Sequence, residues 1–210
     1  VEVVDCVGAQ PYRQIEVILV HDGSTDGTGH LCDRLATEKS SLVRALHRAN
    51  GGPGSARETG RLAARGEVIQ YLDSDDWIDP RKLEIQVEAL RKKPDAEIAY
   101  CRTLETHGSA ESSVFVRGQT GEALESIFPS FLSGRLWHTI TPLYRTTLSD
   151  RIGPWTTLRQ EEDLEYDARA GASGARLVYC PETLATHRHH EGARAGGGSL
   201  SDPGRMRARY

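Results

Sequence analysis

The sequence predicts a Rossmann-like α/β fold, in which a doubly wound and mostly parallel sheet is flanked by helices. Short β-branched segments alternate with helical segments along residues 14–101, as expected for parallel strands joined by crossover helices. Two polar clusters, HDGSTD and DSDDW, directly follow two of these strand segments. Ligands of such sheets bind at the carboxyl ends of strands, so both clusters are candidate binding elements. A chain of 210 residues suffices for one domain of this kind.

The first half of the chain alternates regularly. The β-branched run QIEVILV precedes a turn-rich segment, which indicates a buried strand entering a loop. Leu31, Leu35 and Ala36 then recur at helical spacing. Further along, Asp79 is suited to cap a helix that has Pro80 in its first turn. Strands are predicted at residues 14–20, 41–46, 67–72 and 96–101, and helices at residues 29–38, 55–64 and 81–91.

The pattern is weaker at the start of the chain and after residue 102. Residues 1–4 fit a strand by β-propensity, and they equally fit the end of a helix. Residues 103–121 are polar and predict a loop with an edge hairpin, and the Gly-, Arg- and Ser-rich residues 191–210 predict a flexible tail. The remaining predicted elements are helices at 121–131 and 161–170, an extended segment at 137–145 and a strand at 175–179.

The composition excludes several classes of protein. The net charge of −4 provides no general basic field for nucleic acid. No apolar run approaches the length of a membrane span, and no signal peptide is visible. The four cysteines are far apart and form no C-x-x-C pair, which indicates buried free thiols in a reducing compartment. These features predict a cytoplasmic protein without a transmembrane segment.

The stretch YLDSDDWIDP places three carboxylates, Asp73, Asp75 and Asp76, within four positions after a strand. Aspartate is common in turns and helix caps, and Asp79 fits that simple interpretation. One cap would suffice, however, and carboxylates this close repel each other. Mg²⁺ or Mn²⁺ would relieve the repulsion, since both prefer hard oxygen ligands. Taken alone, the cluster leaves both interpretations open.

A glycine-rich segment, NGGPGSARETG, lies at residues 50–60. Its glycines permit a ligand to approach the backbone closely, although they also suit an ordinary turn. The segment is neither a P-loop nor G-x-G-x-x-G, because Lys-Ser/Thr and the dinucleotide spacing are both missing. Arg57 is suited to face a phosphate, while an exposed arginine is usually only solvated.

Three motifs follow one another in order: HDGSTDGT, N-x-G-x-x-x-A-R-x-x-G and ARGEVIQYLDSDDWIDP. IGPW and EEDLEYDAR follow later in the chain. Together they resemble glycosyltransferase family 2, nearly continuously over residues 9–80. This resemblance implies an inverting enzyme with the GT-A fold. Residues 1–102 would form the nucleotide-sugar-binding half, and residues 103–190 the half that binds the acceptor and carries the catalytic base.

The resemblance also implies roles for individual residues. Asp22 matches the carboxylate that contacts the nucleotide base, Asp73 lies near the ribose, and Asp75 binds the metal on the diphosphate. Asp76 supports these residues, and Asp163 matches the catalytic base. The implied donor-binding set is Asp22, Gly23, Ser24, Asn50, Gly52, Arg57, Asp73 and Ser74, the metal ligands are Asp75, Asp73 and His190, and the catalytic pair is Asp163 and Glu162.

The implied chemistry is consistent with these residue types. A metal ion stabilises the negative charge that develops on a diphosphate leaving group, and an acceptor hydroxyl needs a base within hydrogen-bond reach. The expected partners are Mg²⁺ or Mn²⁺, a UDP-sugar donor, and a glycan or glycolipid acceptor in polysaccharide assembly. The expected location is cytoplasmic, with peripheral association with the inner face of a membrane as the alternative. Without the motifs, EEDLE is simply an acidic first turn of a helix.

The sequence departs from the family pattern in three ways. His21 stands where a first Asp is common, and Glu58 replaces a usual Asn, adding negative charge near the pocket. The usual opening strand has no counterpart, since residues 1–8 correspond to the first helix. The competing hypothesis is therefore a nucleotide-sugar- or glycan-binding module of the same fold without catalysis. A nucleotidyltransferase is disfavoured, because no basic glycine-rich signature lies near the start.

Some other features have an ordinary structural explanation. Trp137 and Trp155 are interpreted first as core residues, although aromatic faces also suit sugar rings. Cys180 with His187, His189 and His190 matches no standard zinc spacing.

Overall fold

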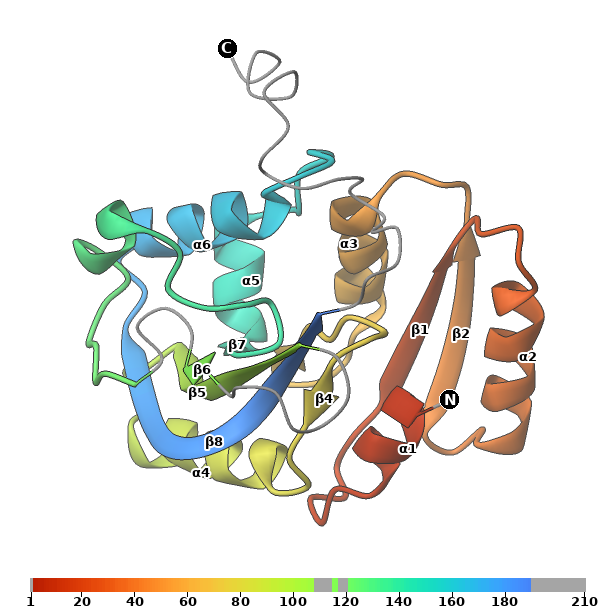
Figure 1. Ribbon diagram of the computed structural model, residues 1–210, viewed down its shortest axis with the longest axis horizontal. Helices are drawn as coiled ribbons and strands as arrows, with labels where there is room; N and C mark the ends of the chain where they lie inside the picture. Colours follow the sequence, from red (N-terminus) through yellow and green to blue (C-terminus); the bar gives the residue numbers. More distant parts are fainter. Residues whose placement is uncertain (1, 108–114, 117–120, 190–210) are drawn as a thin grey trace.

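The computed structural model describes residues 2–107, 115–116 and 121–189. Helices and strands alternate through the first half as predicted, with boundaries shifted by a few residues (Figure 1). The ambiguous opening segment is a helix that buries Val4 and Val7. The elements of this half are α1 Glu2–Gly8, β1 Val17–Asp22, α2 Thr28–Glu38, β2 Val43–Arg48, α3 Pro53–Ala63, β3 Val68–Gln70, β4 Trp77–Ile78, α4 Lys82–Lys92 and β5 Ile98–His107.

The second half is less regular and ends in a long strand. Its last helix begins at the predicted acidic segment, and its last strand curves across the sheet (Figure 1). The elements are β6 Phe115–Val116, the 3₁₀ helix η1 Ser130–Ser133, β7 Leu143–Arg145, α5 Thr146–Ile152, α6 Glu162–Ala172 and β8 Leu177–His189.

The strands form two separate sheets within the described residues. β1 and β2 pair in parallel as a two-stranded sheet, and the other sheet has the order β3-β7-β5-β8-β4 with β6 on β5. β5 and β8 are parallel over ten register pairs, whereas the short strands β3, β4, β6 and β7 pair antiparallel. The predicted α/β class with flanking helices is confirmed. The larger sheet is mixed because short returning strands pair antiparallel, which needs no crossover helix.

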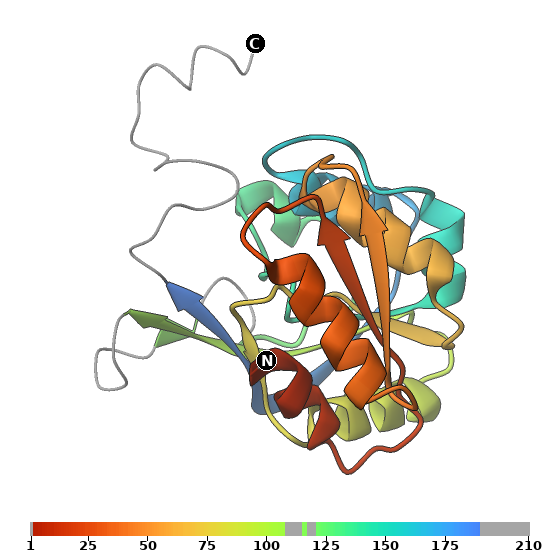
Figure 2. The ribbon, with the colours of Figure 1, turned by 90° about the vertical axis from the view of Figure 1, so that its right-hand side faces the viewer.

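Helices cover both sheets. The β1–β2 pair lies between α2, which contacts β2, and α3, which contacts β1. α4 packs against β5 and β8, while α5 and α6 lie on the opposite side of the larger sheet (Figure 1). Figure 2 shows α2 and the β1–β2 pair stacked in front of the larger sheet. α3 also contacts α6, which brings the first half of the chain against the helix of the predicted base.

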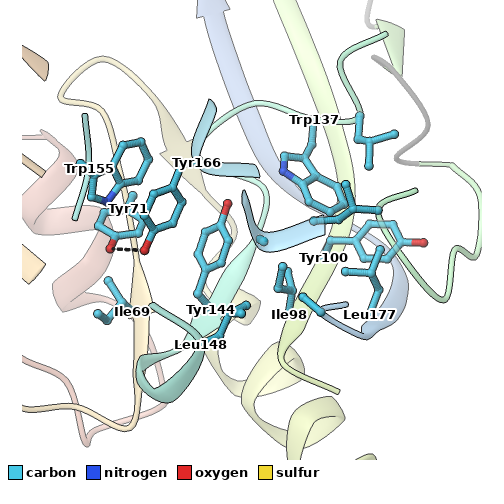
Figure 3. Packing of buried hydrophobic residues seen from close by; sticks show 14 residues of the cluster. Ile69, Tyr71, Ile98, Tyr100, Trp137, Tyr144, Leu148, Trp155, Tyr166 and Leu177 are labelled. Atoms are coloured by element: carbon cyan, nitrogen blue, oxygen red, sulfur yellow. Dashed lines mark hydrogen bonds between the residues drawn. The ribbon is translucent and has the colours of Figure 1, made fainter. Parts of the chain in front are cut away.

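An aromatic cluster fills the core between the larger sheet and α6 (Figure 3). Trp155 and Tyr166 are stacked, with ring centroids 4.0 Å apart, and Tyr71 meets Trp155 edge-on at 4.8 Å. Trp137 is 1% exposed and Trp155 is 5% exposed. The interpretation of both tryptophans as core residues is therefore confirmed. Three of the four cysteines are buried, and all four are free.

Several predicted elements were wrong in type or length. The strand expected at 96–101 continues to His107, so residues 103–107 are strand and not loop. The helix expected at 121–131 is absent, because this segment bonds to the edge of β8: Glu125 O accepts from Leu177 N, and Ser126 bridges Arg176. The strand expected at 175–179 continues to His189 through Pro181, with a register irregularity opposite Cys101 and Arg102. The edge hairpin is confirmed by β5 and β6. The expected flexible tail, 191–210, lies outside the described residues.

Candidate functional site

The turn after β1 is hydrogen-bonded to the glycine-rich turn before α3. The Asp22 carboxylate accepts from the backbone N–H groups of Gly51, at 3.1 and 3.2 Å, and Gly52, at 2.8 Å. Arg48 donates to the same carboxylate at 2.7 Å, and the Asn50 side chain donates to the Asp22 carbonyl at 2.9 Å. Two motifs that are separate in sequence therefore form one structure, which contains the predicted Asp22, Asn50 and Gly52.

Gly23 makes this close approach possible. Its φ of +70° lies in the left-handed region, and a Cβ at this position would be 2.7 Å from the Asn50 nitrogen. Ser24 follows in an exposed position, and its carbonyl lies 3.1 Å from His21 Nε2. A glycine is thus required at position 23, because the backbone is in the left-handed region and a side chain would collide with Asn50.

His21, the residue that replaces the usual Asp, belongs to a chain of polar contacts. Its Nδ1 lies 3.2 Å from Nδ1 of His47, whose Nε2 lies 2.7 Å from Asp33 Oδ1. These side chains border an open hollow of about 340 Å³ at the start of α2. The hollow is lined by His21, Ser24, Thr25, Gly27, Gly29, His30, Asp33 and His47.

Arg57 links the acidic cluster to helix α6. Its guanidinium donates to Asp73 Oδ1 at 2.8 Å and to Glu162 Oε1 at 2.6 Å, and it lies 5.0 Å above the Trp155 ring. The side chain is only 12% exposed, so Arg57 is not the solvated arginine of the simple interpretation. Burial disfavours the cation, but the charges and hydrogen bonds of Asp73 and Glu162 outweigh it and raise the pKa of Arg57.

Asp163 is held next to Glu162 in the first turn of α6. Both amino groups of Arg135 donate to its carboxylate, with Nη2 at 3.2 Å, and Thr139 Oγ1 donates at 3.2 Å. The backbone N–H of Leu164 donates at 2.9 Å. Burial opposes ionisation, but the hydrogen bonds and charge of Arg135 prevail and lower the pKa of Asp163. Asp163 is therefore an ionised carboxylate at neutral pH.

The three carboxylates after β3 have different surroundings. Asp73 is bound by Arg57, and Asp76 is 1% exposed and lies 2.9 Å from His187 Nδ1 on β8. Burial opposes protonation of His187, but its hydrogen bond to Asp76 outweighs this and raises the pKa of His187. The backbone carbonyl of Asp75 accepts from Arg188. Ser74, between the first two carboxylates, is exposed. β8 thus fixes the part of the turn that contains Asp76.

The carboxylates of Asp73 and Asp75 suit a hard divalent cation in type. Mg²⁺ is commonly held by one or two carboxylates together with substrate phosphates and water. Within the described residues, no group of three His, Cys, Asp or Glu side chains is arranged to hold a metal by itself. The donor set fits a cation that binds together with a diphosphate. The predicted ligand His190 lies outside the described residues.

Residues that no motif indicated complete the site. Arg135 and Thr139 bind Asp163 from the segment before β7, and His187 binds Asp76 from β8. A largely buried carboxylate such as Asp163 is stabilised by a charged partner, but the sequence has 26 lysines and arginines and none is singled out by spacing. For His187, the only sequence signal was its place in the histidine-rich segment.

Glu58, a second departure from the family pattern, adds no unpaired charge to the pocket. Arg61 binds it at 2.8 and 2.9 Å, and Trp155 donates its backbone N–H at 3.1 Å. Burial opposes ionisation of Glu58, but the hydrogen bond and charge of Arg61 lower its pKa. Glu58 therefore fastens the segment that contains Trp155 to α3. The expectation that its charge perturbs the pocket is not supported by these contacts.

Comparison with known proteins places this arrangement in context. The sequence model described as "Glycosyl transferase family 2" matches residues 1–148. The uncharacterized glycosyltransferase EpsJ of Bacillus subtilis is 26% identical over 90% of this chain and 57% of its own length.

Solved structures share the fold. The structure of S. aureus TarS 1–349 with UDP-GlcNAc superposes with a TM-score of 0.77 at 21% identity, covering 95% of this chain and 57% of that chain. The mannosyltransferase PcManGT from Pyrobaculum calidifontis, in complex with GDP-Man and Mn²⁺, gives a TM-score of 0.66 at 18% identity, covering 89% and 52%. The chain therefore spans a little over half the length of these proteins. In the described part of the chain, no helix is long and apolar enough to cross a membrane.

Proposed function

Because the chain belongs to glycosyl transferase family 2, we propose that it transfers a sugar from a nucleotide diphosphate to an acceptor hydroxyl, with inversion at the anomeric carbon. One observation carries the proposal: Arg57 joins Asp73 of the acidic cluster to Glu162, the neighbour of Asp163. The motifs that the resemblance assigns to donor binding and to catalysis are therefore in contact through one guanidinium.

The donor is proposed to bind along the two linked turns and the acidic cluster. Residues 1–102 supply this half of the domain, and residues 103–190 supply the half for the acceptor and the base. A UDP-sugar is favoured as donor, since TarS was solved with UDP-GlcNAc and with UDP. The donor-binding residues are proposed to be Asp22, Gly23, Ser24, Asn50, Gly52, Arg57, Asp73 and Ser74.

Asp73 and Asp75 are proposed to hold Mg²⁺ or Mn²⁺ against the donor diphosphate. The Mn²⁺ that accompanies GDP-Man in PcManGT supports this assignment. When bound, such an ion stabilises the negative charge on the departing diphosphate.

Asp163 is proposed to act as the general base. It takes the proton of the acceptor hydroxyl as that oxygen bonds to the anomeric carbon, and the bond from that carbon to the diphosphate oxygen breaks. The nucleoside diphosphate leaves, and a single displacement inverts the carbon. The lowered pKa of Asp163 keeps it ready to accept a proton at neutral pH. The neighbouring Glu162 accepts a hydrogen bond from Arg57 and so keeps the Arg57 guanidinium near Asp163. The acceptor is proposed to be a glycan or glycolipid hydroxyl.

The decisive experiment separates catalysis from binding alone. The 210-residue chain is incubated with UDP-, GDP- and dTDP-sugars and Mn²⁺, and release of nucleoside diphosphate is compared with that of Asp163→Asn. Loss of a general base should reduce turnover about 10²- to 10⁴-fold. UDP binding, measured by thermal shift, should remain in the variant. If neither protein releases nucleoside diphosphate while both still bind UDP, the non-catalytic binding module is supported instead.

A further inference from the structure

Asp167 is a buried carboxylate that the proposed reaction does not use. It lies one helical turn after Asp163 on α6 and is 6% exposed. The indole N–H of Trp137 donates to its Oδ2 at 2.9 Å, and the hydroxyl of Tyr144 donates to its Oδ1 at 2.7 Å. Figure 3 shows the Trp137 nitrogen and the Tyr144 hydroxyl on facing sides of the space between the two rings.

Both donors come from residues 137–144. Trp137 precedes β7 and Tyr144 lies within it, so Asp167 connects α6 to the strand and to the segment before it. The same segment contains Arg135 and Thr139, which bind Asp163. One segment, residues 135–144, therefore holds both carboxylates, and the partners of Asp163 and Asp167 alternate along it. A rotation of α6 would break both sets of hydrogen bonds together.

Among the described residues, no cation lies within hydrogen-bonding distance of Asp167, so its charge is poorly compensated. Burial, together with the negative charge of Asp163, raises the pKa of Asp167 to about 7. The hydrogen bonds of Tyr144 and Trp137 and the charge of Arg135 act in the opposite direction. These groups face Asp167 from α6 itself, from β7 and from the segment before β7. Burial and the charge of Asp167 also raise the pKa of Tyr144, which keeps its hydroxyl a donor.

We propose that Asp167 is a positioning residue for Asp163. It fixes the rotation of α6 through Trp137 and Tyr144, and its charge acts electrostatically on Asp163. The inference rests on the proposed role of Asp163 as base. When Asp167 is protonated, the positive charge of Arg135 acts on the nearby carboxylate of Asp163. When Asp167 is ionised, it places a second negative charge one turn away from Asp163. This charge makes a proton on Asp163 more stable, so Asp163 becomes a stronger base. The site then works best when Asp167 has lost its proton.

The first test needs no catalysis. Aspartate labelled with ¹³C at the carboxyl carbon is followed by NMR through a pH titration. One aspartate should titrate near neutral pH, and its signal should be missing in Asp167→Asn and in Asp167→Glu, so either variant that folds identifies it. Because Asp163 repels the charge of Asp167, the midpoint should move to lower pH in Asp163→Asn. Asp95→Asn removes a half-exposed carboxylate paired with Arg176 and should leave the midpoint unchanged.

Two results would overturn the inference: no aspartate that titrates near neutral pH, or a midpoint that stays in place in Asp163→Asn. Neither result depends on sugar transfer, so a failure of this inference can be distinguished from a failure of the proposed function.

The second test concerns the reaction. With UDP-GlcNAc as donor, the kcat of the wild-type chain should rise through one ionisation between about pH 6 and about pH 8, and this rise should disappear in Asp167→Asn. The KM for the donor should change less than about twofold, because Asp167 contacts α6 and its neighbours and not the donor turns. A purely structural residue would lower kcat at every pH by the same factor. That result, or identical pH profiles of variant and wild type, would overturn the coupling to Asp163.

Discussion

Arg57 donates a hydrogen bond of 2.6 Å to Glu162, which lies 105 positions further along the chain. Both side chains are largely buried, at 12% and 9% exposure. The contact joins α3, which follows the glycine-rich turn, to α6, which carries the proposed base Asp163 in its first turn. A second bond from Arg57 reaches Asp73, so the same side chain also holds the start of the acidic cluster.

Arg57→Met should destabilise the fold, because it leaves the Glu162 carboxylate buried without its partner. Removing one member of a buried ion pair costs about 3 kcal/mol, and urea unfolding measures the loss. Glu162→Gln in the same background should recover part of the stability, since the uncharged amide is less costly to bury. Equal stabilities of the single and double variants would contradict the pairing.

Glu58→Asn, which restores the residue usual in the family, should lower stability in this chain. The shorter side chain cannot bind Arg61 and the Trp155 N–H together, and losing a buried acceptor costs about 1–3 kcal/mol. Glu58→Gln is the matched control, because it keeps the length and an acceptor oxygen and loses only the charge. Urea unfolding should rank wild type above Gln and Gln above Asn. An Asn variant as stable as wild type would show that Glu58 does not fasten the Trp155 segment.

Gly54→Ala should separate α3 from the loop after α5. A Cβ at Gly54 would lie 2.0 Å from the Thr156 carbonyl oxygen, so the backbone has to move. Overpacking of this kind costs about 1–3 kcal/mol and should lower the melting temperature. Gly60→Ala, in the same helix, meets only Val20 Cγ2 at 3.6 Å and should be neutral or stabilising. Similar losses in the two variants would count against the close contact at Thr156.

Because Lys82 is buried, the free energy of unfolding should depend on pH. Lys82 is fully buried, its Nζ donates to Gln86 at 2.5 Å and to Gln70, and burial lowers its pKa to about 8. Its unfolded pKa is about 10.4, so between about pH 8 and pH 10.4 the unfolded chain binds more protons and stability rises with pH. Relative to Lys82→Met, the wild type should gain up to about 3 kcal/mol across this window in guanidinium unfolding.

The control for Lys82 is Lys92→Met. Lys92 is 75% exposed and pairs with Glu88, so its removal should leave the pH dependence as in wild type. A constant stability difference between wild type and Lys82→Met at all pH values would show that Lys82 keeps its ordinary proton affinity when folded.

Asp75→Asn should remove the stabilisation by Mn²⁺ in the presence of UDP. A ligand that binds only the folded state stabilises it by about 2.7 kcal/mol at a concentration one hundred times its Kd, which thermal shift detects readily. Asp95→Asn, a surface carboxylate, should retain the full Mn²⁺ effect. The assignment fails if Mn²⁺ with UDP stabilises Asp75→Asn as much as wild type.

Local sequence pattern was sufficient to predict most elements of the first half, although it left α1 ambiguous and did not predict β4. The strand QIEVILV, for example, is β-branched and ends in a turn cluster, which is a short-range feature. The glycines at residues 50–52 were interpreted as permitting a ligand to approach the backbone, and their hydrogen bonds to Asp22 were not predicted.

Features that depend on long-range pairing were not predictable. β8 continues through Pro181 because β5 offers it a parallel partner, and nothing in its own sequence reveals that partner. Likewise, Arg135 reaches Asp163, and Lys82 meets Gln70, only after the sheet has formed. The segment 121–131 bonds to β8 in preference to closing a helix, which its own composition could not indicate.

Three N–H donors of the chain itself already hold the Asp22 carboxylate. A carboxylate offers about four lone-pair sites, and Arg48, Gly51 and Gly52 approach it through four contacts, two of which come from the single N–H of Gly51. If Asp22 contacts the base of the donor, as proposed, the ring has to compete with these intramolecular donors. The tightness of the glycine turn would then set how selective the site is among bases.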